Sequence, residues 1–115
     1  MNIQIFGTKK SSDSRKAERW FKERRIRFQY VDMAEKGLSV GELRSVAQTQ
    51  GGLAALVDVN ARDAYALSLV QHTPDALLEG ILLENQQVIR TPIVRNGKAA
   101  TLGYEPDIWK GWEQA

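Results

Sequence analysis

The chain has 115 residues, of which 43% are hydrophobic and 26% are charged, and its net charge is +2. This length predicts one domain, 1–115, whose core needs neither a disulfide nor a structural metal. The absence of cysteine excludes disulfide scaffolds, cysteine-ligated metals and thiol chemistry in the chain as written. No apolar run approaches the ~18 residues of a membrane span and no secretory signal is visible, so we expect a cytoplasmic protein without a membrane partner.

The first third of the chain predicts a β-α-β unit. Residues 2–6 alternate between apolar and polar side chains, as a strand does, and Gly7 closes the segment. Residues 12–25 are rich in helix formers and have apolar side chains at helical spacing. Residues 27–31 alternate again, and a strand that follows one helix is most simply the parallel neighbour of the preceding strand.

Residues 39–85 predict an insertion made only of helices. Ser39 and Glu42 have the spacing of a capping box, so a helix is expected to extend to about residue 50, where two glycines end it. Residues 61–70 are rich in alanine and leucine. Thr73 is expected to cap a further helix with Pro74 in its first position, extending to about residue 85.

The last third predicts a hairpin and a terminal helix. Residues 91–95 and 98–102 flank Asn96-Gly97, a dipeptide that favours a two-residue turn with φ above zero at both positions. Glu105-Pro106-Asp107 opens a helix on which Ile108, Trp109 and Trp112 share one face. The expected fold class is therefore α/β, in the order β-α-β-(helical insertion, about 39–85)-β-β-α, with a mixed four-stranded sheet.

Three pieces of this chain, taken in order, resemble the arsenate reductase (ArsC)/Spx family of thioredoxin-like proteins. The helical insertion is one piece, and the other two are short motifs: Ser11-Ser12-Asp13-Ser14-Arg15-Lys16-Ala17, which is similar to the family pattern C-x-x-[SCT]-R-K-A, and Arg90-Thr91-Pro92-Ile93-Val94. The resemblance covers essentially the whole chain. It implies a thioredoxin-like fold, an ancestry in glutathione- and glutaredoxin-linked thiol redox chemistry, and a cis peptide bond between Thr91 and Pro92 beside the active-site loop.

The departures from the family pattern concern its chemistry. By this resemblance the nucleophilic cysteine falls at Ser11 and the resolving cysteine at Ser14. The three arginines that hold the oxyanion in arsenate reductases fall at Asp58, Thr91 and Tyr104. The resemblance thus implies the fold but not arsenate reduction, and it implies no cofactor.

The start of the first helix can still bind an anion, because a helix N-terminus presents free N–H groups and a partial positive charge. Ser12, Asp13 and Arg15 are the candidate anion-binding residues, with Lys10 adding charge. The alternative is that residues 11–14 simply cap the helix, with the Asp13 carboxylate on the same N–H groups. His72, the only histidine, is interpreted as a surface or interhelical residue, and no metal site is predicted.

Basic residues concentrate near the start of the chain: the segment from Lys9 to Arg27 contains nine basic residues and three acidic ones. Glu18 and Glu23 interrupt this run, and its aromatic residues are required by the core. We therefore interpret it as a solvated helix face and expect no direct contact with nucleic acid.

Two functions follow from the resemblance. The first is a descendant of a thiol oxidoreductase that has lost its nucleophile, by natural drift or by a Cys→Ser change, and whose partners are glutathione, glutaredoxin or a small oxyanion. The second is an Spx-like binding module that contacts RNA polymerase. A stand-alone anion or glutathione binder is a third reading.

Overall fold

A mixed four-stranded sheet of order β2-β1-β3-β4 forms the centre of the computed structural model, which describes residues 1–114. Strand β1 (Ile3–Gly7) is parallel to β2 (Phe28–Asp32) and antiparallel to β3 (Ile93–Asn96), which is antiparallel to β4 (Ala99–Leu102). This arrangement confirms the predicted α/β class and mixed sheet.

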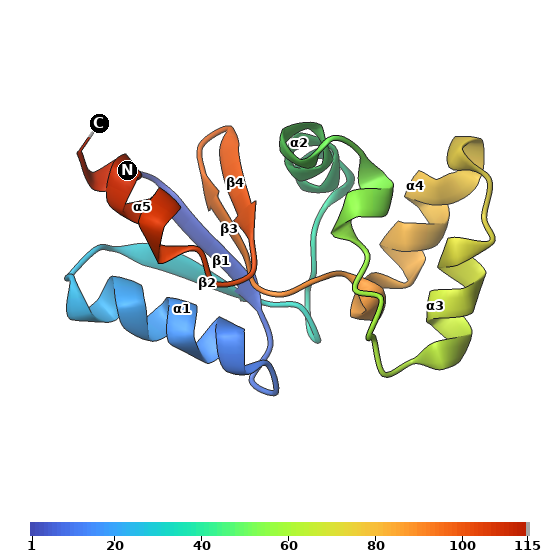
Figure 1. Ribbon diagram of the computed structural model, residues 1–115, viewed down its shortest axis with the longest axis horizontal. Helices are drawn as coiled ribbons and strands as arrows, with labels where there is room; N and C mark the ends of the chain where they lie inside the picture. Colours follow the sequence, from blue (N-terminus) through green and yellow to red (C-terminus); the bar gives the residue numbers. More distant parts are fainter. Residues whose placement is uncertain (115) are drawn as a thin grey trace.

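Helices cover both faces of the sheet (Figure 1). One face carries α1 (Ser12–Glu23) and α5 (Pro106–Glu113). The other carries the helical insertion: α2 (Val40–Gln50), the 3-10 turn η1 (Leu53–Leu56), α3 (Ala64–Gln71), α4 (Asp75–Glu84) and the 3-10 turn η2 (Gln86–Val88). None of the helices within residues 1–114 has the length and apolar character needed to cross a membrane.

The alternation of β1 creates two separate cores. Ile3 and Ile5 pack with α1 and α5, whereas Phe6 points to the insertion. On the α1 side, the indole N–H of Trp109 donates a 2.8 Å hydrogen bond to the buried hydroxyl of Thr101. Trp109 is fully buried, whereas Ile108, which was expected on the same face of the helix, is 47% exposed.

The capping box of α2 is present as predicted. The Ser39 hydroxyl accepts from the Glu42 N–H, and the Glu42 carboxylate accepts from the Ser39 N–H. Gly51 ends the helix with a left-handed φ of 85°, a conformation that glycine adopts without steric cost.

The turn of the β3–β4 hairpin lies one residue later than predicted. Asn96 pairs with Ala99, so the two turn residues are Gly97 and Lys98, and of these only Gly97 has a positive φ, at 61°. A glycine in the first turn position is the pattern of a type II′ turn. Asn96 stays in the ladder and its side-chain oxygen accepts a hydrogen bond from the Asn2 N–H.

The predicted Thr73 cap is wrong. Pro74 occupies the capping position of α4 without a side-chain bond, and the Thr73 hydroxyl donates to the Leu69 carbonyl at 2.6 Å. The hydroxyl therefore satisfies a carbonyl at the open C-terminal end of α3 instead of an N–H of α4.

Helix α1 ends two residues earlier than predicted, because Arg25 adopts a left-handed φ of 56°. This conformation costs an L-residue roughly 1–2 kcal/mol, and glycine is the usual residue there. The reversal aligns β2 in parallel beside β1 from Phe28 onward.

Candidate functional site

The loop between β1 and α1 contains Ser11, the position at which the resemblance to the family places its nucleophile. Ser11 is the N-cap of α1, and its hydroxyl oxygen accepts a 3.1 Å hydrogen bond from the Ser14 N–H. Its own N–H donates to the Thr8 carbonyl at 3.3 Å. The Ser11 hydroxyl thus performs the capping role that serine commonly has at a helix start.

Ser14 is fully buried beneath this loop. Its hydroxyl oxygen accepts a 3.2 Å hydrogen bond from the Thr8 N–H. Gly7 makes room for it, because a Cβ at this position would lie 2.7 Å from the Ser14 Oγ and 2.8 Å from the Tyr30 Oη. Ser14 therefore ties the loop to the helix and has no exposed hydroxyl with which to react.

Tyr30 completes the buried side of the loop. Burial raises the pKa of its phenol, and the nearby carboxylates of Glu18 and Asp32 raise it further. At neutral pH the phenol is protonated and can donate a hydrogen bond, so it is no base for this site.

An open cleft of about 420 Å³ lies in front of Ser11. It is formed where the β1–α1 loop meets the segment between β2 and α2, the segment between η1 and α3, and the chain leading from η2 into β3. Its lining residues are Thr8, Lys10, Ser11, Met33, Ala34, Asp58, Asn60, Ala61, Arg62, Asp63, Gln86, Gln87, Ile89 and Thr91.

Two cations of the cleft are without carboxylate partners. Within residues 1–114, neither Lys10 nor Arg62 lies at ion-pair distance from an acidic group. The acidic lining residues are already engaged: Asp58 accepts from the Asn60 N–H at 2.9 Å, and Asp63 caps α3. The cleft therefore has uncommitted positive charge for a ligand.

Asp63 receives two hydrogen bonds, from the Ala66 N–H at 3.0 Å and from the Gln87 side chain at 3.1 Å. These bonds, led by the one from Ala66, lower the pKa of the Asp63 carboxyl. The carboxylate fixes the start of α3 and so holds the neighbouring Arg62 at the cleft.

Thr91 lines the same cleft as Ser11, and the Thr91–Pro92 bond is cis. In the described part of the chain the Thr91 backbone makes no hydrogen bond to another backbone group, so it remains available to a ligand. Of the three positions at which the resemblance places the oxyanion-binding arginines, Asp58 and Thr91 line the cleft. Tyr104 lies elsewhere, with its ring edge-on to Trp109 at 5.5 Å.

The predicted anion-binding residues lie outside this cleft. Ser12 is exposed and Asp13 is half-buried, and an Nη atom of Arg15 donates to the Lys9 carbonyl at 2.6 Å. The structure thus brings Ser11 and Thr91 to one cleft but not residues 12, 13 and 15. Arg62 was not predicted from the sequence. Its one distinguishing feature there is that it is the only lysine or arginine between Arg44 and Arg90.

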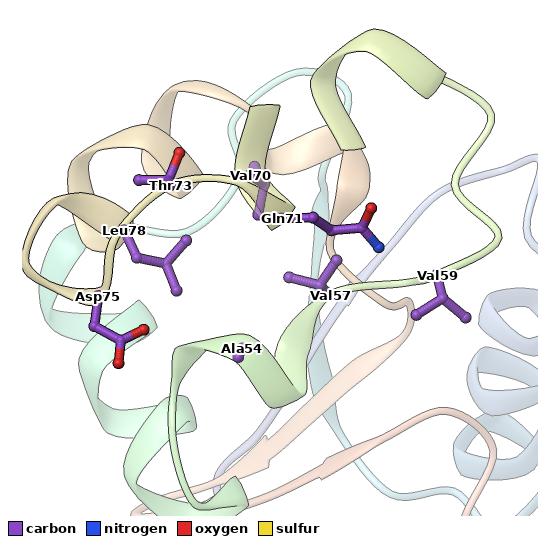
Figure 2. A pocket seen from close by; sticks show the side chains of 8 residues that line it. All are labelled: Ala54, Val57, Val59, Val70, Gln71, Thr73, Asp75 and Leu78. Carbon is purple, nitrogen blue, oxygen red and sulfur yellow. The ribbon is translucent and has the colours of Figure 1, made fainter. Parts of the chain in front are cut away.

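A second cavity of about 230 Å³ lies within the helical insertion (Figure 2). Val57, Val70 and Leu78 form its apolar wall, and Asp75 is its only charged lining residue. His72 is not among the lining residues; its ring contacts the Ser68 carbonyl at 2.7 Å. No set of three or more acidic or histidine side chains in residues 1–114 is placed to hold a metal ion.

Comparison with known proteins identifies this architecture. The ArsC family model matches residues 6–111, and no curated protein matches the sequence. A solved arsenate reductase from Vibrio cholerae is 25% identical, with a TM-score of 0.78 over 94% of each chain. A Bacteroides fragilis protein described as related to the ArsC family is 17% identical, with a TM-score of 0.78 over 96% of this chain and 97% of that one.

A third solved structure, an arsenate reductase-related protein from Brucella melitensis, is 16% identical, with a TM-score of 0.58 over 100% of this chain and 97% of that one. Together the structural matches show an ArsC-type, thioredoxin-like fold over nearly the whole chain.

Proposed function

Because the chain belongs to the ArsC family yet contains no cysteine, we propose that it binds a small peptide of the glutathione class without redox turnover. This proposal rests on the composition of the cleft. It contains Ser11, an unreactive residue that caps α1, together with two cations that form no ion pair, Lys10 and Arg62.

The absence of turnover follows from the chemistry of serine. A helix N-terminus and nearby cations shift the pKa of a thiol, about 8.5, far enough to give thiolate near neutral pH. The same environment does not ionise an alcohol, which needs an adjacent general base. No histidine lines the cleft, and Tyr30 stays protonated.

A peptide ligand fits the cleft better than a bare oxyanion. Lys10 and Arg62 suit carboxylates, and Asp58 and Asp63 on the same walls oppose an ion that is only negative but favour one that also carries an ammonium group. The free backbone of Thr91 suits the amide groups of an extended peptide. The volume lies within the ~300–1,000 Å³ of typical ligand sites.

The test is a calorimetric titration with reduced glutathione at low ionic strength. We expect saturable binding to the wild-type protein, and an affinity loss of roughly 10- to 150-fold for Lys10→Ala and for Arg62→Ala, since a hydrogen bond to a charged group contributes ~1.5–3 kcal/mol. Lys9→Ala is the matched control, because Lys9 is the exposed neighbour of Lys10 and does not line the cleft.

Two results would refute the proposal. One is the absence of binding at millimolar glutathione, and the other is an equal loss of affinity in Lys9→Ala and Lys10→Ala. Tighter binding of inorganic arsenate than of glutathione would favour the oxyanion instead.

A second candidate is a protein-binding module of the Spx kind, with RNA polymerase as partner. It is supported by large apolar side chains that the helical insertion exposes, among them Val59 at 70%, Tyr65 at 81% and Leu77 at 63%. Retention of purified RNA polymerase by the immobilised protein, lost in Tyr65→Ser, would favour it. Failure to retain the polymerase would count against it.

A further inference from the structure

The far end of α1 carries a basic groove that the glutathione proposal does not use. The groove measures about 400 Å³ and is lined by Lys22, Arg25, Ile26, Arg27 and Phe28. Helix α1 has 12 residues, so at 1.5 Å per residue the groove lies ~18 Å from Ser11. In Figure 1 one end of α1 adjoins the loop from β1, which contains Ser11, and the other end leads to β2.

Charge in this groove has one sign. Three of its five lining residues are cations and none is acidic. Lys22 pairs with Glu18 at 3.7 Å on the helix surface, but within residues 1–114 neither Arg25 nor Arg27 lies at ion-pair distance from a carboxylate. Two guanidinium groups are therefore available for a partner.

Arg25 occupies a backbone position that disfavours it. Its φ of 56° is the only positive φ of a non-glycine residue within 1–114, at the place after a helix where glycine is least strained. An arginine is present here although glycine would relieve the backbone strain. This is an independent indication that the side chain has a use in binding.

The floor of the groove is apolar. Ile26 and Phe28 are half-buried and pack at the edge of the α1–α5 core. Guanidinium groups match carboxylates in a planar, two-bond geometry. A partner that fits both features has carboxylates on either side of an apolar residue.

From this combination we propose that the groove binds an acidic peptide segment of a protein partner, with an apolar side chain on Ile26 and Phe28 and carboxylates on Arg25 and Arg27. Nucleic acid fits less well, because the groove has no fully exposed aromatic ring for base stacking.

The test uses a five-residue peptide, acetylated and amidated, with leucine at its centre and glutamate at the other four positions. In ¹⁵N NMR titrations at low salt we expect the largest shifts at Lys22 and residues 25–28. Added salt should weaken the binding, since exposed charges are screened. A peptide with glycine at the centre should bind more weakly.

Arg25→Gly gives the most informative variant. We expect its melting temperature to rise, because the left-handed strain is removed, while its affinity for the peptide falls about fivefold, the effect of losing one exposed ion pair of ~1 kcal/mol. Arg27→Gln should lower the affinity similarly. Arg19→Gln, an exposed change on α1 outside the groove, should leave it unchanged.

The proposal is overturned by any of three results: unchanged affinity in Arg25→Gly, an equal loss in Arg19→Gln, or tighter binding of a twelve-nucleotide oligothymidylate than of the peptide. Glutathione binding at the Ser11 cleft is measured separately, so the failure of one proposal leaves the other intact.

Discussion

Among single residues, Ser11 and Ser14, which the resemblance aligns with two cysteines, both use their hydroxyls to hold the β1–α1 loop. The Ser11 hydroxyl caps α1 by accepting from the Ser14 N–H, and the Ser14 hydroxyl accepts from the Thr8 N–H. A helix N-terminus and the neighbouring Lys10 lie beside Ser11, an environment that would stabilise a thiolate. A cysteine introduced at Ser11 can therefore test the electrostatic environment separately from the loss of the nucleophile.

Ser11→Cys should carry a thiol with an apparent pKa well below the usual ~8.5, because the Ser14 N–H and the helix dipole stabilise the thiolate. The measurement is the pH dependence of iodoacetamide alkylation. Lys22→Cys, in the last turn of α1, is the control; Arg25 and Arg27 lie near it, but it is at the negative end of the helix dipole, so its lowering should be smaller than that of Ser11→Cys. Equal midpoints for the two thiols would show that the electrostatic setting has been lost with the cysteine.

Ser14→Ala should lower the free energy of unfolding by about 1–3 kcal/mol, because it leaves the partly buried N–H of Thr8 without the acceptor that the buried Ser14 supplies. Urea denaturation monitored by tryptophan fluorescence measures this change. Ser12→Ala alters an exposed neighbour and should stay within ~0.5 kcal/mol of wild type. A neutral Ser14→Ala would mean that water replaces the hydroxyl.

At the scale of elements, the start of α3 links stability to the cleft. Asp63 caps this helix, and its pKa is lowered. As the pH falls through the ordinary value of 3.8, the unfolded chain takes up a proton before the folded one does. The stabilisation is therefore complete above the unfolded pKa and is lost as the pH falls through the folded pKa.

Asp63→Asn keeps a side-chain oxygen for the cap but does not titrate. We expect its free energy of unfolding to decline less steeply than that of the wild type between about pH 5 and pH 2, measured by urea titration at each pH. Parallel pH profiles for the two proteins would contradict the role assigned to the carboxylate.

Local sequence signals predicted those elements whose signal lies within a few residues. The capping box at Ser39 and the proline in the first turn of α5 are found where expected. The signals failed where two local choices compete. Asn96-Gly97 was expected to form the turn, but pairing with Ala99 keeps Asn96 in the ladder, and Thr73 bonds backwards to Leu69.

The candidate site was predictable only in part for a related reason. The positions of Ser11 and Thr91 follow from the motifs, and both line the cleft. Arg62 comes from a segment whose placement depends on the packing of α3 and η2 around the Asp63–Gln87 bond. No spacing in the sequence records that long-range arrangement.

In the whole molecule, each of the two cores holds a different part of the cleft in place. The aromatic core under α1 and α5 brings Trp20, Phe21 and Trp109 within 5.4 Å of one another, measured between ring centroids, and it holds the helix that presents Ser11. The second core fixes the insertion that supplies Arg62. The cleft is lined by residues of the β1–α1 loop and of the helical insertion, so it is assembled only in the complete fold.

The chain has the ArsC architecture, and we propose that it carries out no thiol-dependent redox reaction because it contains no cysteine. The most direct measurement is NADPH oxidation in the presence of arsenate, glutathione, glutaredoxin and glutathione reductase. We predict the same rate with and without the wild-type protein, because no thiolate is available at Ser11. Oxidation that depends on both the protein and arsenate, above the buffer background, would contradict the account.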